Sequence, residues 1–129
     1  MTLQVKISKK LVPYKRAFSS LRKRVELVKK NKAKELVWVL EHPLTFTSGI
    51  RFTEKEILDK KIHVIKTNRG GKITLHSPGQ KIVYFALNLN KRKKDVKNLV
   101  KQIECCIIEF LKLYKINSNA DKKNIGIWV

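Results

Sequence analysis

The chain has 129 residues, of which 43% are hydrophobic, and a formal net charge of +20 at pH 7. This length suits one domain with a single core, and the ordinary hydrophobic content excludes an intrinsically disordered chain. The sequence has no signal-peptide pattern and no long apolar run. Its two cysteines, Cys105 and Cys106, are adjacent and cannot bridge each other without strain. We therefore expect a single domain over residues 1–129, located in the reducing cytoplasm and not in a membrane.

The positive charge is carried mainly by lysine, which supplies 24 of the 30 basic residues. Arginine usually dominates where bases or phosphates are bound bidentately. No nucleic-acid-binding motif and no stacking array of aromatic residues accompanies the charge. The composition thus favours a solvated lysine-rich surface over a nucleic-acid-binding one. Such a surface would also attract an acidic protein through long-range electrostatics.

The first third of the chain predicts a strand, a helix and a second strand. Alternating apolar residues from Leu3 to Ile7 indicate the first strand, and Pro13 is expected in the first turn of the helix. One side of this helix is apolar and the other basic, which favours packing on a core over lying on a membrane. The continuous apolar run from Leu36 to Leu40 predicts a buried central strand. The apolar stripe of the helix consists of Ala17, Phe18, Leu21, Val25 and Val28.

Glu41-His42-Pro43 follows this strand directly. His42 could act as a catalytic base. A histidine before proline at the end of a strand more often forms hydrogen bonds that shape a turn, and we favour this structural role. The polar residues 52–61 predict a connection with a helical turn.

The second half of the chain predicts two further strands and a long helix. Residues 62–66 indicate one strand, and the apolar residues 81–89 indicate another in the centre of the sheet. Asp95 is expected to cap a helix that extends to Tyr114. The inward stripe of this helix would contain Val96, Leu99, Val100, Ile103, Cys106, Ile107, Phe110 and Tyr114.

Neither cysteine has the surroundings of a nucleophile. A reactive thiol needs a helix N-terminus, a base or a cation beside it. Cys105 and Cys106 instead fall in the middle of the predicted helix, about 100° apart around its axis. We expect structural roles for both, and no metal site because no second ligand pair is spaced for one. Ile125 to Val129 predicts a strand that forms an unpaired or weakly covered edge.

The stretch from Arg69 to Gln80 reads R-G-G-K-I-T-L-H-S-P-G-Q and contains three of the five glycines. Gly70-Gly71 permits positive φ and close approach of the backbone to a ligand. Ser77-Pro78-Gly79 is typical of a turn. Between these bends the residues alternate as in a half-buried strand. From the residues alone, an ordinary hairpin with a basic edge is an equally good interpretation.

This stretch resembles the lipoyl (octanoyl) transferase family, which has Arg-Gly-Gly, two residues, Thr, an aromatic residue and His-Gly-Pro-Gly-Gln here. Two positions depart from the family pattern: Leu75 replaces the aromatic residue and Ser77 replaces a glycine. Because of the second departure, we expect Ser77→Gly to be tolerated or stabilising: if residue 77 adopts positive φ, removing its Cβ relieves strain. The matching residues are Arg69, Gly70, Gly71, Thr74, His76, Pro78, Gly79 and Gln80, with Glu41, His42, Pro43, Phe46, Thr47 and Gly49 upstream and Gly126 to Val129 near the end.

The resemblance implies an α/β fold, a mixed sheet with flanking helices like that of biotin and lipoate protein ligases, incomplete at the C-terminus. It also implies transfer of an octanoyl group from octanoyl-acyl carrier protein to a lysine on lipoyl domains of lipoate-dependent enzymes, through a cysteine thioester and without a cofactor. The family's nucleophilic cysteine and activating lysine are expected beyond Val129. The chain would then be the N-terminal part of a catalytic domain, with no catalytic residue of its own and no activity alone.

The expected acyl-binding wall consists of Arg69, Gly70, Gly71, Lys72, Ile73, Thr74, Leu75 and His76. Either Thr74 or His76 would orient the thioester, and we expect Arg69 and His76 to lie in one pocket beside Gly70-Gly71. The alternatives are a non-enzymatic basic module that binds nucleic acid or an acidic protein, and a pseudoenzyme remnant.

Overall fold

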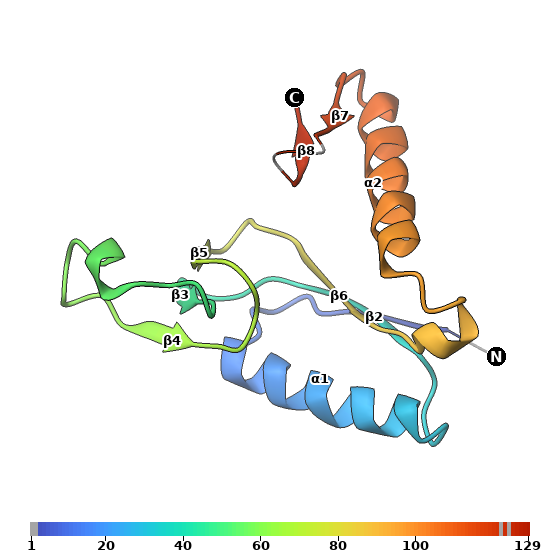
Figure 1. The fold of residues 1–129 in the computed structure, drawn as a ribbon, viewed down its shortest axis with the longest axis horizontal. Coiled ribbons are helices and arrows are strands. Elements are labelled where there is room, and N and C mark those ends of the chain that lie inside the picture. Colours follow the sequence, from blue (N-terminus) through green and yellow to red (C-terminus); the bar gives the residue numbers. More distant parts are fainter. Residues whose placement is uncertain (1–2, 122, 124) are drawn as a thin grey trace. The chain divides into compact units, whose positions relative to one another are not determined.

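The computed structural model describes residues 3–121, 123 and 125–129 and divides the chain into two compact units, Met1–Leu87 and Asn88–Val129 (Figure 1). The expectation that residues 1–129 belong to one catalytic domain remains a prediction.

The first unit contains a three-stranded sheet with the order β1 (Gln4–Ile7), β2 (Leu36–Leu40) and β6 (Ile82–Ala86). β1 runs parallel to β2, whereas β6 is antiparallel to it. Helix α1 (Tyr14–Lys29) lies along this sheet, and its buried Ala17 belongs to the same core cluster as Leu36, Trp38, Leu40 and Ala86 (Figure 1). Pro13 immediately precedes α1 as its N-cap, one position before the first turn in which we expected it.

A second sheet in this unit has β3 (Thr45–Ser48) at its centre, between β4 (Val64–Lys66) and β5 (Ile73–His76). β4 is parallel and β5 antiparallel to β3. A short 3₁₀ helix, Glu54–Glu56, forms the helical turn expected between residues 52 and 61. The fold is therefore α/β with mixed sheets as predicted, although the strands of the first unit form two three-stranded sheets where one mixed sheet was expected.

Two predictions about strand order are wrong. The apolar β6 was expected at the centre of its sheet, but β2 holds that position in the described residues and β6 flanks it. The hairpin interpretation also fails, because β4 and β5 do not pair with each other and instead flank β3. The Arg69–Lys72 segment is thus a connection that crosses over β3.

The second unit contains a 3₁₀ helix, Leu89–Lys91, helix α2 (Val96–Leu113) and a small antiparallel hairpin of β7 (Asn119–Ala120) and β8 (Ile127–Trp128). Asp95 caps α2 as predicted, because its carboxylate accepts a hydrogen bond of 2.9 Å from the Asn98 N–H. β8 pairs with β7 on one side only, and Ile125, Trp128 and Val129 are exposed, so among the described residues the strand is a weakly covered edge as expected, although it is not unpaired.

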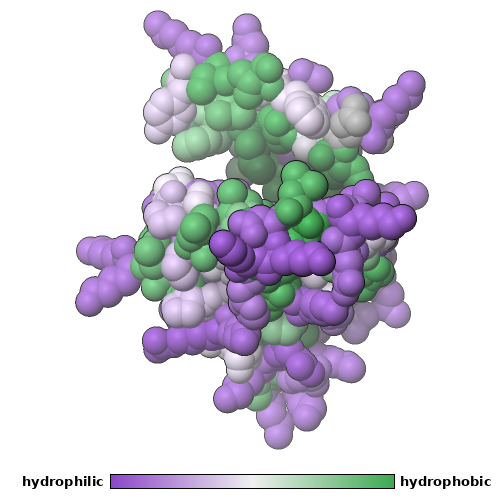
Figure 2. Space-filling view, turned by 90° about the vertical axis from the view of Figure 1, so that its left-hand side faces the viewer, coloured by the Kyte–Doolittle hydropathy of each residue, from purple (hydrophilic) through white to green (hydrophobic). Residues whose placement is uncertain are grey.

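The apolar stripe of α2 is not an inward face in the part of the chain that the structure describes. None of the helix residues is buried, and both cysteines are exposed. Figure 2 shows green apolar side chains between projecting purple hydrophilic ones over the surface in view. No helix among the described residues combines the length and apolarity needed to cross a membrane.

Candidate functional site

Four rings from separate segments of the first unit gather at one place, which we call the ring cluster: Tyr14, His42, His76 and Tyr84. The ring centroids of Tyr14 and His42 are 5.3 Å apart, and those of His42 and His76 are 5.4 Å apart. Tyr84 lies 5.9 Å from His42. The ring cluster therefore joins four segments: the first turn of α1, the residues after β2, the end of β5 and the middle of β6.

His42 is fully buried, and both of its ring nitrogens have partners. Nδ1 is 2.6 Å from the Val12 carbonyl, which can only accept, so Nδ1 carries the proton. Nε2 then accepts a hydrogen bond of 2.9 Å from the Tyr84 hydroxyl. Burial lowers the pKa of His42, and the charge of His76 lowers it further, which favours the neutral ring. Burial, with a smaller effect of Tyr14, raises the pKa of Tyr84 to about 12. His42 is thus a hydrogen-bonding residue as predicted, although its partners lie in distant segments and not in the turn at Pro43.

His76 is half-buried and stacks on the Tyr14 ring at a centroid distance of 5.8 Å and an interplanar angle of 18°. Its Nδ1 lies 3.1 Å from Oε1 of Gln80. An amide oxygen only accepts, so Nδ1–H donates here, and Nε2 has no hydrogen-bond partner among the described residues. His76 is thus held by a ring and an amide while one nitrogen stays free to meet a ligand.

Arg69 forms hydrogen bonds that hold the segment Arg69–Lys72 against β3. Its Nη2 donates to the carbonyl and the hydroxyl of Thr47, at 2.9 and 3.0 Å, and to the Lys72 carbonyl at 2.8 Å. Its Nη1 donates to the Gly70 carbonyl at 2.9 Å. Four acceptors of the protein therefore bind the two terminal nitrogens and position the segment, while the buried Nε has no hydrogen-bond partner among the described residues. The sequence motif gave no sign of these contacts.

The glycine segment packs very closely against the end of β3. A Cβ added at Gly49 would lie 2.3 Å from the Gly71 oxygen and 2.6 Å from the Gly70 oxygen. Gly71 has φ +86°, the positive φ expected for this pair. The close backbone approach predicted at Gly70-Gly71 is thus made to Gly49.

The carbonyls of this segment point into the protein, and two of its N–H groups do not. The carbonyls of Arg69, Gly71 and Lys72 accept from the N–H groups of Ile50, Arg51 and Gly49, respectively. The N–H groups of Gly70 and Gly71 donate to no group in the described part of the chain. Two adjacent backbone donors are consequently available to an oxygen of a ligand.

Residues 77–80 form a type II turn, in which the Gln80 N–H donates to the Ser77 carbonyl at 3.1 Å. Pro78 and Gly79 are the central residues, and Gly79 has φ +88°. Ser77 is not among the residues with positive φ, so the expected strain at Ser77 is absent. The reason is that the turn needs its left-handed residue at Gly79, two positions later.

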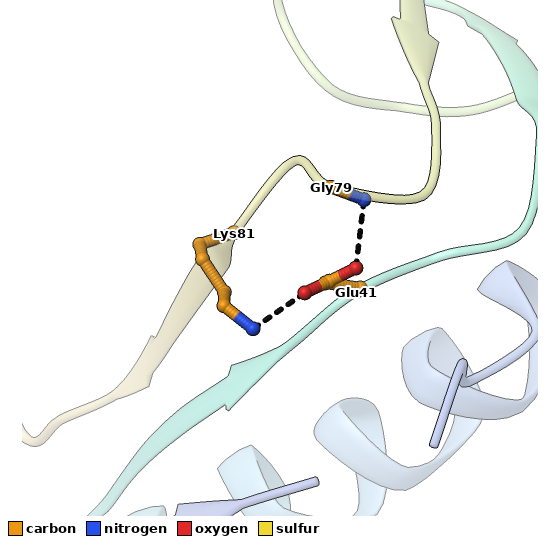
Figure 3. A network of polar contacts seen from close by, with 3 residues as sticks. All are labelled: Glu41, Gly79 and Lys81. Carbon is orange, nitrogen blue, oxygen red and sulfur yellow. Dashed lines mark hydrogen bonds and ion pairs between the residues drawn. The ribbon is translucent and has the colours of Figure 1, made fainter. Parts of the chain in front are cut away.

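Glu41 connects this turn to the end of β2 (Figure 3). One carboxylate oxygen accepts from the Gly79 N–H at 2.8 Å, and the other pairs with the Lys81 ammonium. The Lys81 hydrogen bond, followed by that of Gly79, lowers the pKa of Glu41. This acidic residue of the Glu-His-Pro motif therefore fixes the segment that follows His76.

The eight residues of the expected wall do not share one face of their sheet. Thr74 pairs with Thr47 on one face, the face of His76, while Ile73 and Leu75 pair with Ser48 and Phe46 on the other. Lys72 forms an ion pair of 2.6 Å with Glu56. Arg69 contacts Thr47 and so reaches the His76 face, but a cavity of about 370 Å³ in this unit is lined by neither residue. Their common pocket remains a prediction.

Sequence reasoning missed Tyr14 and Tyr84 as neighbours of the motif histidines. The only local signal was their position, one after Pro13 at the helix start and the other within the apolar run of β6. Contacts between residues so far apart in the chain follow from strand pairing, which a single sequence does not specify.

Comparison of the sequence with models of known protein families identifies the family of this chain. The model of the lipoyl protein ligase A/B catalytic domain matches residues 13–129. The chain therefore belongs to the lipoyl protein ligase A/B catalytic domain family, and its α/β fold is the lipoate ligase-like fold.

Within this family the chain is similar to curated octanoyltransferases. It is 42% identical over 124 residues to the octanoyltransferase of Wolbachia pipientis wMel, covering 95% of the chain and 60% of the relative. It is 40% identical to that of the Wolbachia of Brugia malayi, with the same coverage. The identity to the Bradyrhizobium diazoefficiens octanoyltransferase is 36%, covering 96% of the chain and 50% of the relative. The chain thus spans 50–60% of the length of these relatives.

Proposed function

We propose that the first unit supplies the acyl-binding wall of an octanoyltransferase. The enzyme transfers an octanoyl group from octanoyl-acyl carrier protein to a lysine of lipoyl domains in lipoate-dependent enzymes, within the cytoplasm. The similarity to octanoyltransferases over 95% of the chain supports this assignment. The wall lies on the sheet face that carries Thr74 and His76.

The observation that carries the proposal is the pair of unpaired N–H groups of Gly70 and Gly71. Acyl transfer passes through a tetrahedral intermediate with negative charge on the former carbonyl oxygen, and preorganised backbone donors stabilise that charge. Arg69 and Gly49 hold the two donors in place without occupying them. In this proposal His76, whose Nε2 has no partner among the described residues, belongs to the same wall and would orient the thioester or the incoming amine, with Thr74 beside it.

The covalent steps require a thiolate. It attacks the thioester carbonyl of octanoyl-acyl carrier protein, forming an acyl-cysteine and releasing the carrier's thiol; the lysine amine then attacks the acyl-cysteine, forming an amide and restoring the thiol. Cys105 and Cys106 are exposed residues in the middle of α2, and neither sulfur has a hydrogen-bonded base or cation among the described residues. We therefore assign neither the role of nucleophile, and we expect this chain to bind the acyl donor without transferring its acyl group.

Two measurements test the proposal. After incubation of the purified chain with octanoyl-acyl carrier protein, intact mass spectrometry should show no octanoyl adduct. A hydroxylamine-sensitive adduct on Cys105 or Cys106, with turnover onto a lipoyl domain, would contradict the assignment of the cysteines.

The wall itself is tested by calorimetric titration with octanoyl-pantetheine. We expect His76→Ala to weaken binding and His63→Ala, at an exposed histidine outside the ring cluster, to leave it unchanged. Equal affinity of the two variants, or no binding to the unmodified chain, would contradict the position of the wall.

The lysine-rich surface supports an acidic carrier protein as the donor. The net charge of +20 gives a long-range attraction for such a partner that weakens with salt. This part of the proposal predicts a faster association with the carrier at low ionic strength, measured by stopped-flow fluorescence.

A further inference from the structure

The cavity of about 370 Å³ in the first unit lies on the face of the second sheet that is opposite to His76. Ser48 pairs with Lys66 in the register of β3 and β4, and both line the cavity together with Val64. Thr47 and Thr74, paired with each other, project from the other face, as does His76. The cavity is consequently separated from the ring cluster by the sheet itself.

The lining combines an apolar part with charged groups. Phe52, Ile57 and Val64 contribute apolar surface, and the buried Ser48 lies at the strand. Lys60 and Lys66 are exposed, so their positive charge faces solvent at the cavity. Neither lysine forms an ion pair within the residues that the structure describes.

Glu54 is the one acidic group among the lining residues, against the two lysines. Glu56, two residues further along the same 3₁₀ helix, forms an ion pair with Lys72 at 2.6 Å. The balance of charge at the cavity is therefore positive. Its volume is at the lower end of ligand sites, which are roughly 300–1,000 Å³.

We propose that this cavity is a second small-molecule site, which binds a carboxylic acid with a short or medium alkyl chain. The alkyl chain would lie against Phe52, Ile57 and Val64, and the carboxylate would lie between the ammonium groups of Lys60 and Lys66. This ligand removes apolar surface from water while its charge is paired with two cations that are otherwise unpaired. The inference does not depend on acyl transfer at the opposite face.

The test is a titration of the full chain with butanoate, hexanoate and octanoate, followed by two-dimensional amide NMR. We expect the largest shifts at the amides of Ile57, Val64 and Lys66, and a dissociation constant that tightens by about fourfold per added methylene until the cavity is filled. Octylammonium, which has the same number of carbon atoms as octanoate and a positive charge, should bind much more weakly. Shifts confined to Gly70, Gly71 and His76 would overturn this inference and support the proposed acyl wall instead.

Three variants sharpen the result. Lys66→Gln and Lys60→Gln should each weaken octanoate binding by about two- to fivefold, whereas Lys55→Gln on the adjacent 3₁₀ helix, outside the lining, should not change it. Glu54→Gln should tighten binding, because it removes the one repulsive carboxylate.

The steric test is Ile57→Trp, which places a bulky indole ring in the cavity and should abolish binding. A circular dichroism melt of each variant verifies that it is folded, and the lysine variants keep the inference testable if Ile57→Trp does not fold. Equal binding of octanoate and octylammonium, no dependence on chain length, or no binding at all would each overturn the proposal.

Discussion

The hydroxyl of Tyr84 donates a 2.9 Å hydrogen bond to Nε2 of the buried His42, while the opposite nitrogen of that ring donates to the carbonyl of Val12. This bond joins β6 to the residues that follow β2 and leaves His42 with no free nitrogen. A catalytic exchange of protons at His42 would break one of the two bonds. The neighbouring His76, in contrast, has one ring nitrogen without a hydrogen-bond partner among the described residues.

We expect the stability of the first unit to fall as the pH is lowered below 6.5. The folded-state pKa of His42 is lowered from its ordinary value of 6.5, chiefly by burial, so the unfolded chain takes up the proton first. The contribution of neutral His42 to the free energy of unfolding is then complete above pH 6.5. It decreases as the pH falls from 6.5 to the lowered folded-state pKa. Urea unfolding on either side of pH 6.5 measures this dependence.

The matched variants for this pH dependence are His42→Gln and His63→Gln. The first should lose the acid-induced decrease that His42 causes, and the second, at an exposed position, should retain it. A pH dependence that is the same in all three proteins would show that His42 is not its origin.

Tyr84→Phe should destabilise the chain by about 1–3 kcal/mol, because Nε2 of the buried His42 is left without a donor. Tyr114→Phe is the control, since Tyr114 is 65% exposed at the end of α2. The measurement is the free energy of unfolding in urea at neutral pH. Equal stabilities of the two variants would mean that water replaces the Tyr84 hydroxyl at no cost.

Gly49→Ala should cost about 1–3 kcal/mol of stability, as overpacking in a close-packed region does. The added methyl group would meet the backbone oxygens of Gly70 and Gly71, which cannot swing aside as a flexible side chain can. Gly70→Ala is the control, because a Cβ at that position meets nothing within 4 Å and Gly70 does not have positive φ. Chemical denaturation of the two variants compares them, and similar midpoints would refute the close contact.

Ser77→Gly should destabilise the chain by about 0.4–1 kcal/mol, because glycine increases the entropy of the unfolded chain without relieving strain. This reverses the sequence-based expectation, since Ser77 does not have positive φ. Gly79→Ala should cost about 1–2 kcal/mol, because it forces an L-residue into the left-handed conformation. Thermal melts decide between destabilisation by chain entropy and stabilisation by relief of strain. A higher melting temperature for Ser77→Gly than for the unmodified chain would support relief of strain, as first expected from the sequence.

The local elements of this fold could be predicted from the sequence, because their signals are local. The run from Leu36 to Leu40 forms β2, and Asp95 caps α2 as its position indicated. Strand order could not be predicted. The apolar composition of β6 indicates that the strand packs against neighbours. It does not indicate which strands those neighbours are.

The candidate site shows the same division. The motif identified Arg69 and His76, but the role of Arg69 depends on acceptors in Thr47 and Lys72 that only the β3 pairing brings within reach. The stack of His76 on Tyr14 likewise joins β5 to a helix near the start of the chain. Contacts of this kind are properties of the topology, and one sequence carries no direct record of them.

The pairing of β2 with β6 has a consequence for the order of events during synthesis. Leu36 pairs with Ala86, so β2 reaches its antiparallel partner only after the intervening segments, the whole second sheet among them, have left the ribosome. Contacts of such large sequence separation form slowly because loop closure must come first. Until then the apolar strand Leu36–Leu40 has an unsatisfied backbone edge open to other chains. The nascent chain is thus expected to be most prone to aggregation before residues 82–86 have left the ribosome.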